Sequence, residues 1–501
     1  MRPVDAFVGS RIRVDWRLDI SAWARENLQL TNPAYKRAER EFVRLGEIPR
    51  EIKLYEETTM WIDLPRGCLS DLLTEFPDVN LIDRRSSGFK IDTRAWVHPT
   101  MRTYQQKALN NIVAENGVYE APPGAGKTIV ILEAIRRLER KAIVIVNRAA
   151  LADQWAQRAE EHFGIPVGII GDGVWDEQDV TIAMQQSLWS RIDDLNRTNF
   201  WEAWGFVCLD ETHHASARTF YDVLDRFPAL HRVGVSATPV KDPELEPFIR
   251  GILGPTIHET TPEELVAAGV GVKPRVVIAE TSFKHSFWPT HRPYDKKKAQ
   301  KTGRSCQWEP HCNRRGKVHR NNYQQVMDDL VADEKRNSLI ADCIVDSINP
   351  ATQLDPRVCI VLSKRLSHLD ELCRLVTIKY TSLWTFPPSV EFLTGREDQS
   401  KRELVMKRVE SDARGLVIFS TIADEGLDIP RLDAIFLAYP GRNVKTLQQQ
   451  VGRIERGHPD KGDPMIVDFS DQVGILQSQL EDRIGFYESR DFEIDIVPRS
   501  E

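Results

Sequence analysis

Short apolar runs alternate with longer amphipathic stretches in two separate series along this chain. The first series, from about residue 100 to 280, reads GVYEAP, KAIVIVN, DVTIAM, FVCLD and HRVGVSA, and the second, from about 335 to 472, reads RVCIVLS, SVEFLTG, GLVIFST, DAIFLAYP and PMIVDFS. The segments between the runs are long enough for crossover helices, and buried parallel strands read as near-continuous apolar runs. The pattern predicts two α/β domains in tandem, each a doubly wound parallel sheet with helices on both faces.

The length and composition set limits on the class of protein. A chain of 501 residues is too long for one core and suggests three or four domains. No apolar run approaches the roughly 20 residues of a membrane span, and the first residues lack the apolar core of a secretion signal. The seven cysteines are scattered and odd in number, which favours a reducing interior. We therefore expect a protein that is not secreted and contacts no membrane, cytoplasmic in a prokaryote or phage and nuclear in a eukaryote.

The expected domain organisation follows from these shifts in pattern. Residues 1–95 mix strand-like and helix-like stretches and predict a small α+β domain, a candidate DNA-binding module. Residues 96–282 and 331–472 hold the two α/β series, and 473–501 form a C-terminal tail. Residues 283–330 break the pattern, because they are polar, basic and aromatic. From Lys284 to Arg320 eleven Lys or Arg stand against two acids, a local charge of +9 in a chain whose net charge is −7.

A glycine-rich segment, APPGAGKT from Ala121 to Thr128, lies between a strand-like run and an apolar helix-like run. In such a loop the backbone N–H groups and the N-terminus of the following helix surround phosphates. The residues expected around the nucleotide are Pro123, Gly124, Ala125, Gly126, Lys127 and Thr128. Lys127 is expected to reach the β- and γ-phosphates of ATP, and Thr128 to give its hydroxyl to Mg²⁺.

The segment FVCLDETHH places two acids and two histidines after an apolar run. All four side chains are metal-ligating types, but the histidines are adjacent rather than four apart, which disfavours a zinc protease site. A P-loop protein instead needs an acid at the end of a second strand to hold Mg²⁺. Asp210 fits that position, Glu211 is the candidate for polarising the attacking water, and His213 is expected to link the phosphate site to the second α/β domain.

The order of further segments resembles that of superfamily 2 helicases. The residues that carry the resemblance are RTYQQKAL with Gln105 before the P-loop, VIVNRAALADQW, TIAMQQSL, SATP, IVLSKRLSHLDEL, STIADEGLDIP and QQQVGRIER. Each segment alone is weak, but the ordered set is specific. Within the superfamily, the DETH box, ADEGLDIP and GRIERGHPDKGDPMIVDF resemble the branch that contains UvsW and XPB. The resemblance implies two RecA-like motor domains that hydrolyse ATP with Mg²⁺ and bind adenine through Gln105.

The resemblance also assigns roles in the second α/β domain. Arg453 and Arg456 are expected to reach the γ-phosphate, where positive charge stabilises the transition state of phosphoryl transfer. Gln449 belongs to the same motif, and Gly426 and Asp428 are expected to face the nucleotide. Hydrolysis would then require both motor domains to close together.

Contacts with nucleic acid are expected in two places. Arg148, Gln185 and Thr421 occupy motifs that face the nucleic-acid backbone in the family. The insert adds basic residues interleaved with aromatic ones, a combination that suits phosphate contact and base stacking, although a solvated loop is the alternative. Its basic candidates are Lys296, Lys297, Lys298, Arg314 and Arg315. Cys306 and Cys312, with nearby histidines, could also form a small zinc site, although their spacing is wider than usual.

The sequence therefore predicts an ATP-driven superfamily 2 helicase or translocase that acts on duplex or branched DNA. By family resemblance, movement would be 3′ to 5′, with repair, recombination or fork remodelling as its setting. Two alternatives stay open. RNA helicases share the Asp-Glu-x-His box, although the branch resemblance favours DNA. The chain could also be the motor or clamp subunit of a larger nucleic-acid-processing complex.

Overall fold

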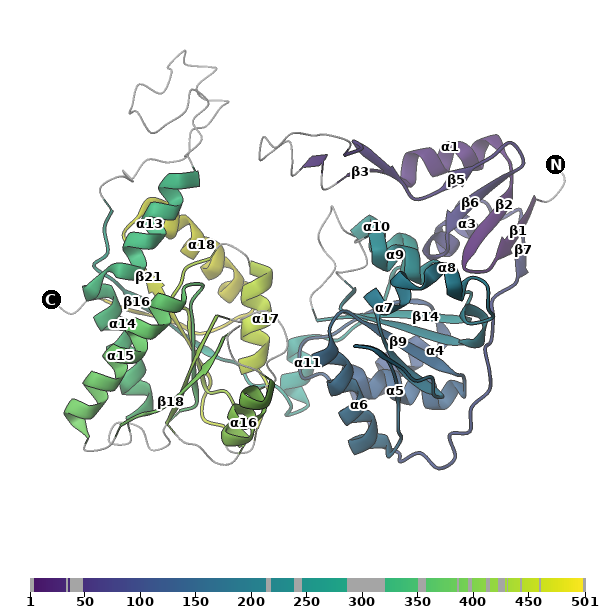
Figure 1. Cartoon of the computed structure of the whole chain (residues 1–501). Helices are drawn as coiled ribbons and strands as arrows, with labels where there is room; N and C mark the ends of the chain where they lie inside the picture. Colours follow the sequence, from purple (N-terminus) through teal and green to yellow (C-terminus); the bar gives the residue numbers. More distant parts are fainter. Residues whose placement is uncertain are drawn as a thin grey trace, which may run out of the picture. The chain divides into compact units, whose positions relative to one another are not determined.

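The computed structural model of the chain describes residues 4–32, 35–36, 48–212, 218–237, 246–285, 320–349, 357–384, 387–394, 399–410, 415–421, 429, 431–441, 444–458 and 461–498 (Figure 1). The chain divides into two compact units, Met1–Ala268 and Gly269–Glu501. The first unit holds a small mixed sheet and the first large sheet, and the second unit holds the other large sheet. Among the described residues, no helix combines the length and the apolarity needed to cross a bilayer.

The N-terminal part of the first unit is a mixed five-stranded sheet with the strand order β5-β6-β2-β1-β7. In β2 (Arg11–Asp15) buried and more exposed residues alternate, and the buried residues of the sheet pack on its helices and on Phe248 of the neighbouring domain. The elements are β1 (Val4–Val8), β2 (Arg11–Asp15), α1 (Leu18–Asn27), β5 (Glu56–Glu57), β6 (Trp61–Pro65), α3 (Leu69–Glu75) and β7 (Val79–Asp83), beside the hairpin of β3 (Gln29–Thr31) and β4 (Glu51–Lys53). The expected α+β character is present.

This small sheet is attached to the first large domain by arginines. Arg11 donates to the carboxylate of Asp225 across 2.8 Å. Buried Arg66 donates to the carbonyl oxygens of Ala229 and Leu230, the two residues that precede β14 (His231–Ser236). Because these contacts join backbone and side chains that are largely buried, the N-terminal sheet and the first large sheet form one compact unit.

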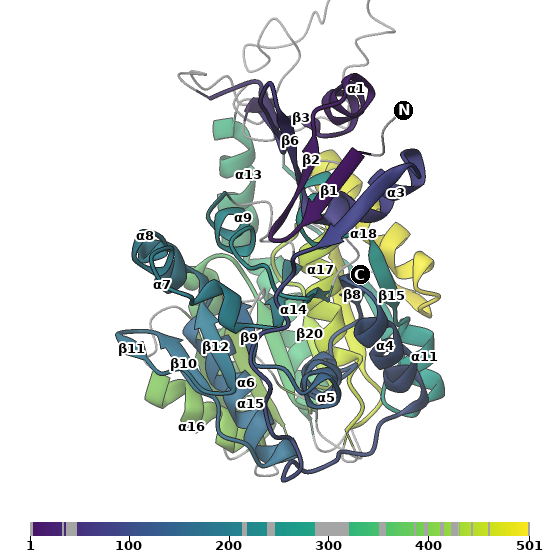
Figure 2. The same cartoon turned by 90° about the vertical axis from the view of Figure 1, so that its right-hand side faces the viewer.

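The first large sheet has eight strands in the order β11-β10-β12-β9-β13-β14-β8-β15. All neighbouring strands are parallel except β10 and β11. The strands are β8 (Gly117–Glu120), β9 (Ala142–Val146), β10 (Gly168–Gly171), β11 (Val174–Trp175), β12 (Val180–Met184), β13 (Phe206–Asp210), β14 and β15 (Thr256–Glu259). The longer helices are α4 (Thr103–Ala114), α5 (Lys127–Leu138), α6 (Ala149–Phe163), α9 (Arg218–Leu224) and α10 (Glu246–Leu253). Figure 2 shows this sheet with its helices from the side.

The five strands predicted from the first apolar series are all present as β8, β9, β12, β13 and β14. Each is buried along nearly its whole length, which is why its sequence reads as a continuous apolar run. The carboxyl ends of parallel strands meet at one edge of the sheet, so the segments after β8 and β13 are brought toward each other.

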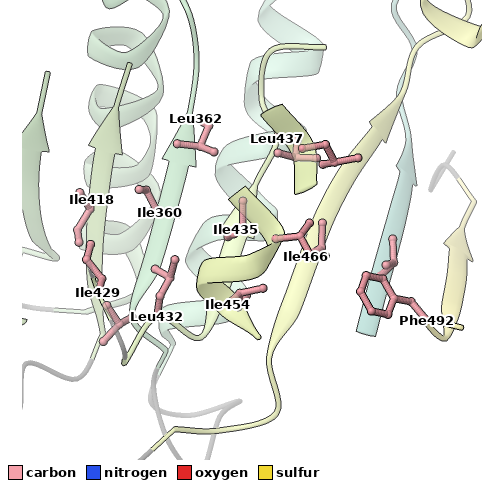
Figure 3. Packing of buried hydrophobic residues seen from close by; sticks show 14 of the residues in the cluster. Ile360, Leu362, Ile418, Ile429, Leu432, Ile435, Leu437, Ile454, Ile466 and Phe492 are labelled. Carbon is pink, nitrogen blue, oxygen red and sulfur yellow. The ribbon is translucent and has the colours of Figure 1, made fainter. Parts of the chain in front are cut away.

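The second large sheet has seven parallel strands in the order β18-β19-β17-β20-β21-β16-β22. Its strands are β16 (Arg275–Glu280), β17 (Cys359–Leu362), β18 (Ser389–Leu393), β19 (Leu416–Ser420), β20 (Ala434–Phe436), β21 (Met465–Ser470) and β22 (Ile494–Val497). Its helices include α13 (Arg320–Ala332), α14 (Glu334–Ile348), α15 (Leu366–Leu383), α16 (Gln399–Glu410), α17 (Val444–Ile454) and α18 (Gly474–Ser489). One face packs Ile360, Ile418, Ile435 and Ile466 into a continuous apolar core (Figure 3).

Two boundaries differ from those expected from the sequence. The strand β16 lies inside the stretch that was expected to close the first motor domain at residue 282, yet it pairs with β21 and β22 in the second sheet. The C-terminal stretch from 473 onward is not a separate tail, because α18 packs on that sheet and β22 pairs with β16. A strand's partner depends on contacts distant in sequence, which an apolar run does not encode.

Candidate functional site

The loop between β8 and α5 has the backbone shape of a phosphate cradle. Gly124 and Gly126 have φ values of +84° and +79°, in the left-handed region that glycine adopts without strain. The helix α5 begins at Lys127, and no side chain caps its N-terminus. Backbone N–H groups at such a helix start have no intrahelical acceptor and favour an anion. The backbone of the loop therefore suits phosphate binding, and nucleotide binding by these residues stays a prediction.

The side chain of Gln105, on α4, forms a hydrogen bond with the backbone of this loop. Its Nε2 donates to the carbonyl oxygen of Ala125 at 3.0 Å, and its Oε1 accepts from the backbone N–H of Arg102 at 3.0 Å. A Cβ atom added at Gly126 would lie 2.5 Å from Nε2 of Gln105, and the left-handed backbone at this position also favours glycine. The carboxamide of Gln105, expected to read adenine, here holds the P-loop in its conformation.

Lys127 and Thr128 occupy the first turn of α5. The Nζ of Lys127 donates to the carbonyl oxygen of Ala121 at 2.8 Å, and it lies 3.4 Å from the carbonyl oxygen of Pro122. The hydroxyl of Thr128, on a side chain that is 6% exposed, accepts from Nη1 of Arg158 at 3.2 Å. Lys127 thus lies along its own loop, from which its flexible side chain can turn toward a phosphate.

Asp210 is the last residue of β13. Its Oδ2 accepts from the indole Nε1 of Trp155 at 2.8 Å, and its Oδ1 accepts from the backbone N–H of Glu211 at 2.9 Å. Burial and the neighbouring Glu211 carboxylate raise the pKa of Asp210 to about 6. The hydrogen bond from Trp155 and the charge of Lys127 act in the other direction and lower this pKa. Glu211 itself has φ of +54°, an uncommon conformation for a residue with a side chain.

The oxygen donors of this site fit magnesium. Mg²⁺ prefers hydroxyl, carboxylate and phosphate oxygens, and it is held in such proteins by few protein ligands. The hydroxyl of Thr128 and the carboxylate of Asp210 are ligands of this kind, and Lys127 is close enough to Asp210 to lower its pKa. Because Asp210 and Glu211 are adjacent and partly buried, a divalent cation would relieve the repulsion between their carboxylates.

The strand β14 lies between β13 and β8 and connects the two halves of the site. The backbone N–H of Ala121, at the start of the loop, donates to the carbonyl oxygen of Ser236 at 3.0 Å. On the other side, a Cβ atom at Gly234 would lie 2.3 Å from Cγ2 of buried Thr212. The strand β14, whose last residue Ser236 begins the segment SATP, therefore contacts both the P-loop and the segment after Asp210.

The arginines predicted to act on the γ-phosphate belong to the second unit. Arg453 lies in the last turn of α17, and Arg456 follows the helix and pairs in an isolated bridge with Gly271. Gln449 lies in the same helix. Lys461 donates to the carbonyl oxygens of Ile454 and Arg456 at 2.6 and 2.8 Å, which fixes the end of α17.

The described candidates for nucleic-acid contact differ in exposure. Arg148 is exposed at the N-cap of α6, and Thr421 is partly exposed directly after β19. Gln185, the first residue of α7 (Gln185–Ser190), is only 2% exposed, so its side chain points into the domain. Its neighbour Gln186 is exposed and lies 3.4 Å from the carbonyl oxygen of Asn147 through its Nε2. The sequence alone did not indicate which of these two adjacent glutamines is exposed.

Several predicted site residues lie outside the described residues. These are His213, Gly426, Asp428, Lys296, Lys297, Lys298, Arg314, Arg315 and the proposed zinc ligands Cys306 and Cys312. Within the part of the chain that the structure describes, no group of three or more His, Cys, Asp or Glu side chains is arranged to hold a metal ion.

Two residues beside the site were not assigned a role from sequence. Trp155 and Arg158 lie three positions apart on α6, and they contact Asp210 and Thr128 respectively. Trp155 ends the quoted segment VIVNRAALADQW, but its contact with a strand 55 positions away could not be read from that segment.

Family comparisons match both large domains. The family described as "Type III restriction enzyme, res subunit" matches residues 98–241, and the "Helicase conserved C-terminal domain" matches residues 338–458. These ranges contain the P-loop and Asp210 in the first case, and α17 in the second. The match covers both halves of the predicted motor.

Individual relatives have low sequence identity to this chain but match most of its length. A protein of Sulfurisphaera tokodaii named "DNA 3'-5' translocase XPB2" is 22% identical over 362 residues, which are 71% of this chain and 78% of that protein. The "Putative ATP-dependent RNA helicase L396" of Acanthamoeba polyphaga mimivirus is 23% identical over 452 residues, 88% of this chain and 77% of the relative. A fragment of a putative HsdR subunit of a type I restriction enzyme from Vibrio vulnificus has the same fold, with a TM-score of 0.56 and 18% identity over 81% of this chain and 70% of that one.

Proposed function

We propose that this chain, which belongs to superfamily 2 of the helicases and resembles the branch of UvsW and XPB, is an ATP-driven motor that translocates along DNA. Family membership implies a nucleic-acid-dependent helicase that uses ATP and Mg²⁺. DNA as the substrate, movement from 3′ to 5′ and action on branched structures are the finer parts of the proposal. The relative named a DNA 3′-5′ translocase supports the first two parts. Action on branched structures rests on the sequence resemblance to the branch that contains UvsW.

The observation that carries the proposal is the convergence of Lys127, Thr128 and Asp210 at the carboxyl edge of the first large sheet. The N-terminus of α5 and the two left-handed glycines would hold the phosphates through backbone N–H groups. Lys127 would leave its loop carbonyls and neutralise phosphate charge. Mg²⁺ bound with ATP would supply further charge neutralisation, with Thr128 and Asp210 as the residues that hold it.

Water activation falls to Glu211 in this proposal. It follows Asp210 directly, and its left-handed backbone turns the chain sharply at the strand end. A carboxylate at that position can orient a water molecule toward the γ-phosphate. Arg453 and Arg456 would stabilise the charge that develops on that phosphate when the second unit contributes them.

A steady-state ATPase assay tests the proposal directly. Turnover is measured with no nucleic acid, single-stranded DNA, duplex DNA, a four-way DNA junction and RNA of matched sequence. Stimulation by DNA, greatest with the junction, is the expected result. Lys127→Ala should abolish turnover in every arm while leaving the melting temperature unchanged, and its unaltered turnover would contradict the P-loop assignment.

An RNA-directed motor is the second candidate, because the relative that spans 88% of this chain is named a putative RNA helicase. Stimulation by RNA alone in the same assay would favour it over the DNA motor. Turnover that no nucleic acid changes would favour a motor subunit that depends on a partner protein.

A further inference from the structure

The helix α6 directs two side chains at the phosphate-binding site from one of its faces. Trp155 and Arg158 are three residues apart, a spacing that places both on the same side of a helix. The indole Nε1 of Trp155 lies 2.8 Å from Oδ2 of Asp210, and Nη1 of Arg158 lies 3.2 Å from the hydroxyl oxygen of Thr128. One rigid element therefore contacts both protein groups that are suited to hold magnesium.

Trp155 is a suitable hydrogen-bond partner for Asp210, whose carboxylate must remain able to bind a cation. Its side chain is 2% exposed, so its ring is fixed by packing. The indole N–H can only donate, and it carries no charge. It can therefore orient one oxygen of Asp210 without competing electrostatically with a metal ion, as an arginine or lysine would. The second oxygen of Asp210 accepts the backbone N–H of Glu211, so both oxygens have defined positions.

Arg158 also contacts this site, but its positive charge opposes a metal ion there, whereas the neutral indole of Trp155 does not. Burial is the main influence on the pKa of Arg158 and lowers it, whereas the nearby Asp210 carboxylate raises it. A cation that donates to the hydroxyl of Thr128 repels a divalent ion at the same oxygen. Binding of Mg²⁺ with ATP at Thr128 therefore has to displace Arg158 from this contact.

We propose that Trp155 and Arg158 are positioning residues for magnesium-dependent ATP binding, Trp155 by holding the Asp210 carboxylate in its coordinating orientation and Arg158 by a cationic contact at Thr128 that the metal must replace. The inference rests on the proposed function, since it concerns the same phosphate-binding site. According to this proposal, Trp155 and Arg158 have opposite effects on magnesium-dependent ATP binding. A general packing role of α6 would not produce that difference.

The test measures affinity for a fluorescent ATP analogue on the full chain, once in EDTA and once in excess Mg²⁺. Trp155→Phe keeps the aromatic packing and removes the N–H. We expect its affinity in EDTA to match the parent and the gain in affinity on adding Mg²⁺ to fall by on the order of tenfold, the effect of one hydrogen bond to a charged group. Gln157→Ala, on an exposed position of the same helix, is the matched control and should behave as the parent.

A double variant separates the proposed route from others. If Trp155 acts through Asp210, Trp155→Phe should change nothing further in an Asp210→Asn background. An equal additional loss in that background would overturn the inference, as would an equal loss of affinity in EDTA and in Mg²⁺ accompanied by a lower melting temperature.

Arg158→Gln is expected to shift the dependence the other way, so that a lower Mg²⁺ concentration gives half of the metal-dependent gain. Weaker binding in both EDTA and Mg²⁺ would instead make Arg158 a phosphate ligand and overturn its part of the inference. A parent protein that binds no ATP in either condition would contradict the proposed function. A parent that binds normally, with Trp155→Phe keeping the full gain, would contradict only the inference.

Discussion

Arg336 and Asp471 form a buried ion pair that joins α14 to the end of β21 in the second unit. The Nε of Arg336 lies 2.8 Å from Oδ1 of Asp471, its Nη2 lies 3.2 Å from Oδ2, and the two side chains are 0% and 1% exposed. Arg336 also donates to the carbonyl oxygen of Ala438 at 2.9 Å, and Thr281 donates to Asp471 at 2.6 Å. This one pair thus ties together four segments that are distant in sequence.

Arg336→Met should destabilise the second unit strongly, because it leaves the carboxylate of Asp471 buried without its cation. Breaking a buried pair by removing one partner costs roughly 3–5 kcal/mol of unfolding free energy. Hydrogen exchange of peptides from α14 and β21 provides the measurement.

The exposed i,i+3 pair of Arg374 and Glu371 offers the control, and Arg374→Met should have little effect on stability. The double variant Arg336→Met with Asp471→Leu should recover part of the loss, since the buried charge is then gone as well. Equal effects of Arg336→Met and Arg374→Met would show that burial does not control the strength of this pair.

His368 should make the second unit sensitive to acid. Its ring nitrogens lie 3.0 Å from the hydroxyl of Ser363 and 3.0 Å from Oδ1 of Asn337, and burial together with Arg336 lowers its pKa to about 3 from 6.5. The folded unit resists a proton that the unfolded chain accepts, so stability rises with pH between about 3 and 6.5. Between pH 7 and pH 5 the loss from this group should be roughly 2 kcal/mol.

The measurement for His368 is hydrogen exchange of α14 and α15 at pH 5 and pH 7, corrected for the intrinsic pH dependence of exchange. In His368→Gln the acid-dependent part of the loss should be absent, although the variant is less stable at both values. A parent and a variant that lose equal stability between the two pH values would contradict the role given to His368.

The sequence predicted the parts of the fold whose signals are local. The ten strands of the two apolar series and the loop before Lys127 all appear, because an apolar run and a Gly-rich turn carry their structural cause within a few residues. The strand β16 was assigned to the wrong side of a boundary, since its partners β21 and β22 lie far along the chain. Short strands such as β1 and β15 also lack a distinctive local pattern.

The same division holds for the site. The positions of Lys127 and Thr128 at the start of α5 and of Asp210 at the end of β13 could be predicted, because each follows a local sequence pattern. Their chemical roles stay predictions. Trp155 could not be predicted, because its contact with Asp210 depends on how α6 packs on the sheet. The exposure of Gln186 rather than Gln185 is of the same kind, since it is decided by the direction in which α7 leaves β12.

Arg66 should hold the N-terminal sheet on the first large domain. It is 4% exposed and donates to the carbonyl oxygens of Ala229 and Leu230. Arg66→Met leaves these acceptors buried without their donor, which costs roughly 1–3 kcal/mol per charged hydrogen bond. We expect faster hydrogen exchange in β1, β2 and the start of β14. Arg250→Met removes an exposed ion pair with Asp71 at the same contact and should have little effect, and equal effects of the two would contradict the assignment.

Gly234→Ala should impair hydrolysis more than nucleotide binding. A Cβ atom at this position would lie 2.3 Å from Cγ2 of Thr212 and 2.5 Å from Cδ1 of Leu253, so the added methyl has to push one of them aside. Thr212 is fully buried and follows Glu211, so its displacement shifts the residue proposed to orient water. The three atoms nearest to this methyl group belong to Thr212 and Leu253, and none belongs to the loop before Lys127.

We therefore expect Gly234→Ala to lower nucleic-acid-stimulated turnover by on the order of tenfold or more, because small displacements of catalytic groups cost large factors in rate. Overpacking should also cost roughly 1–3 kcal/mol of stability. Affinity for ATP in Mg²⁺ should stay close to that of the parent. Gly9→Ala is the matched control, since its Cβ would meet nothing closer than 4.0 Å. Unchanged turnover in a stably folded Gly234→Ala protein would show that β14 does not position Glu211, and that the contact with Thr212 serves packing alone.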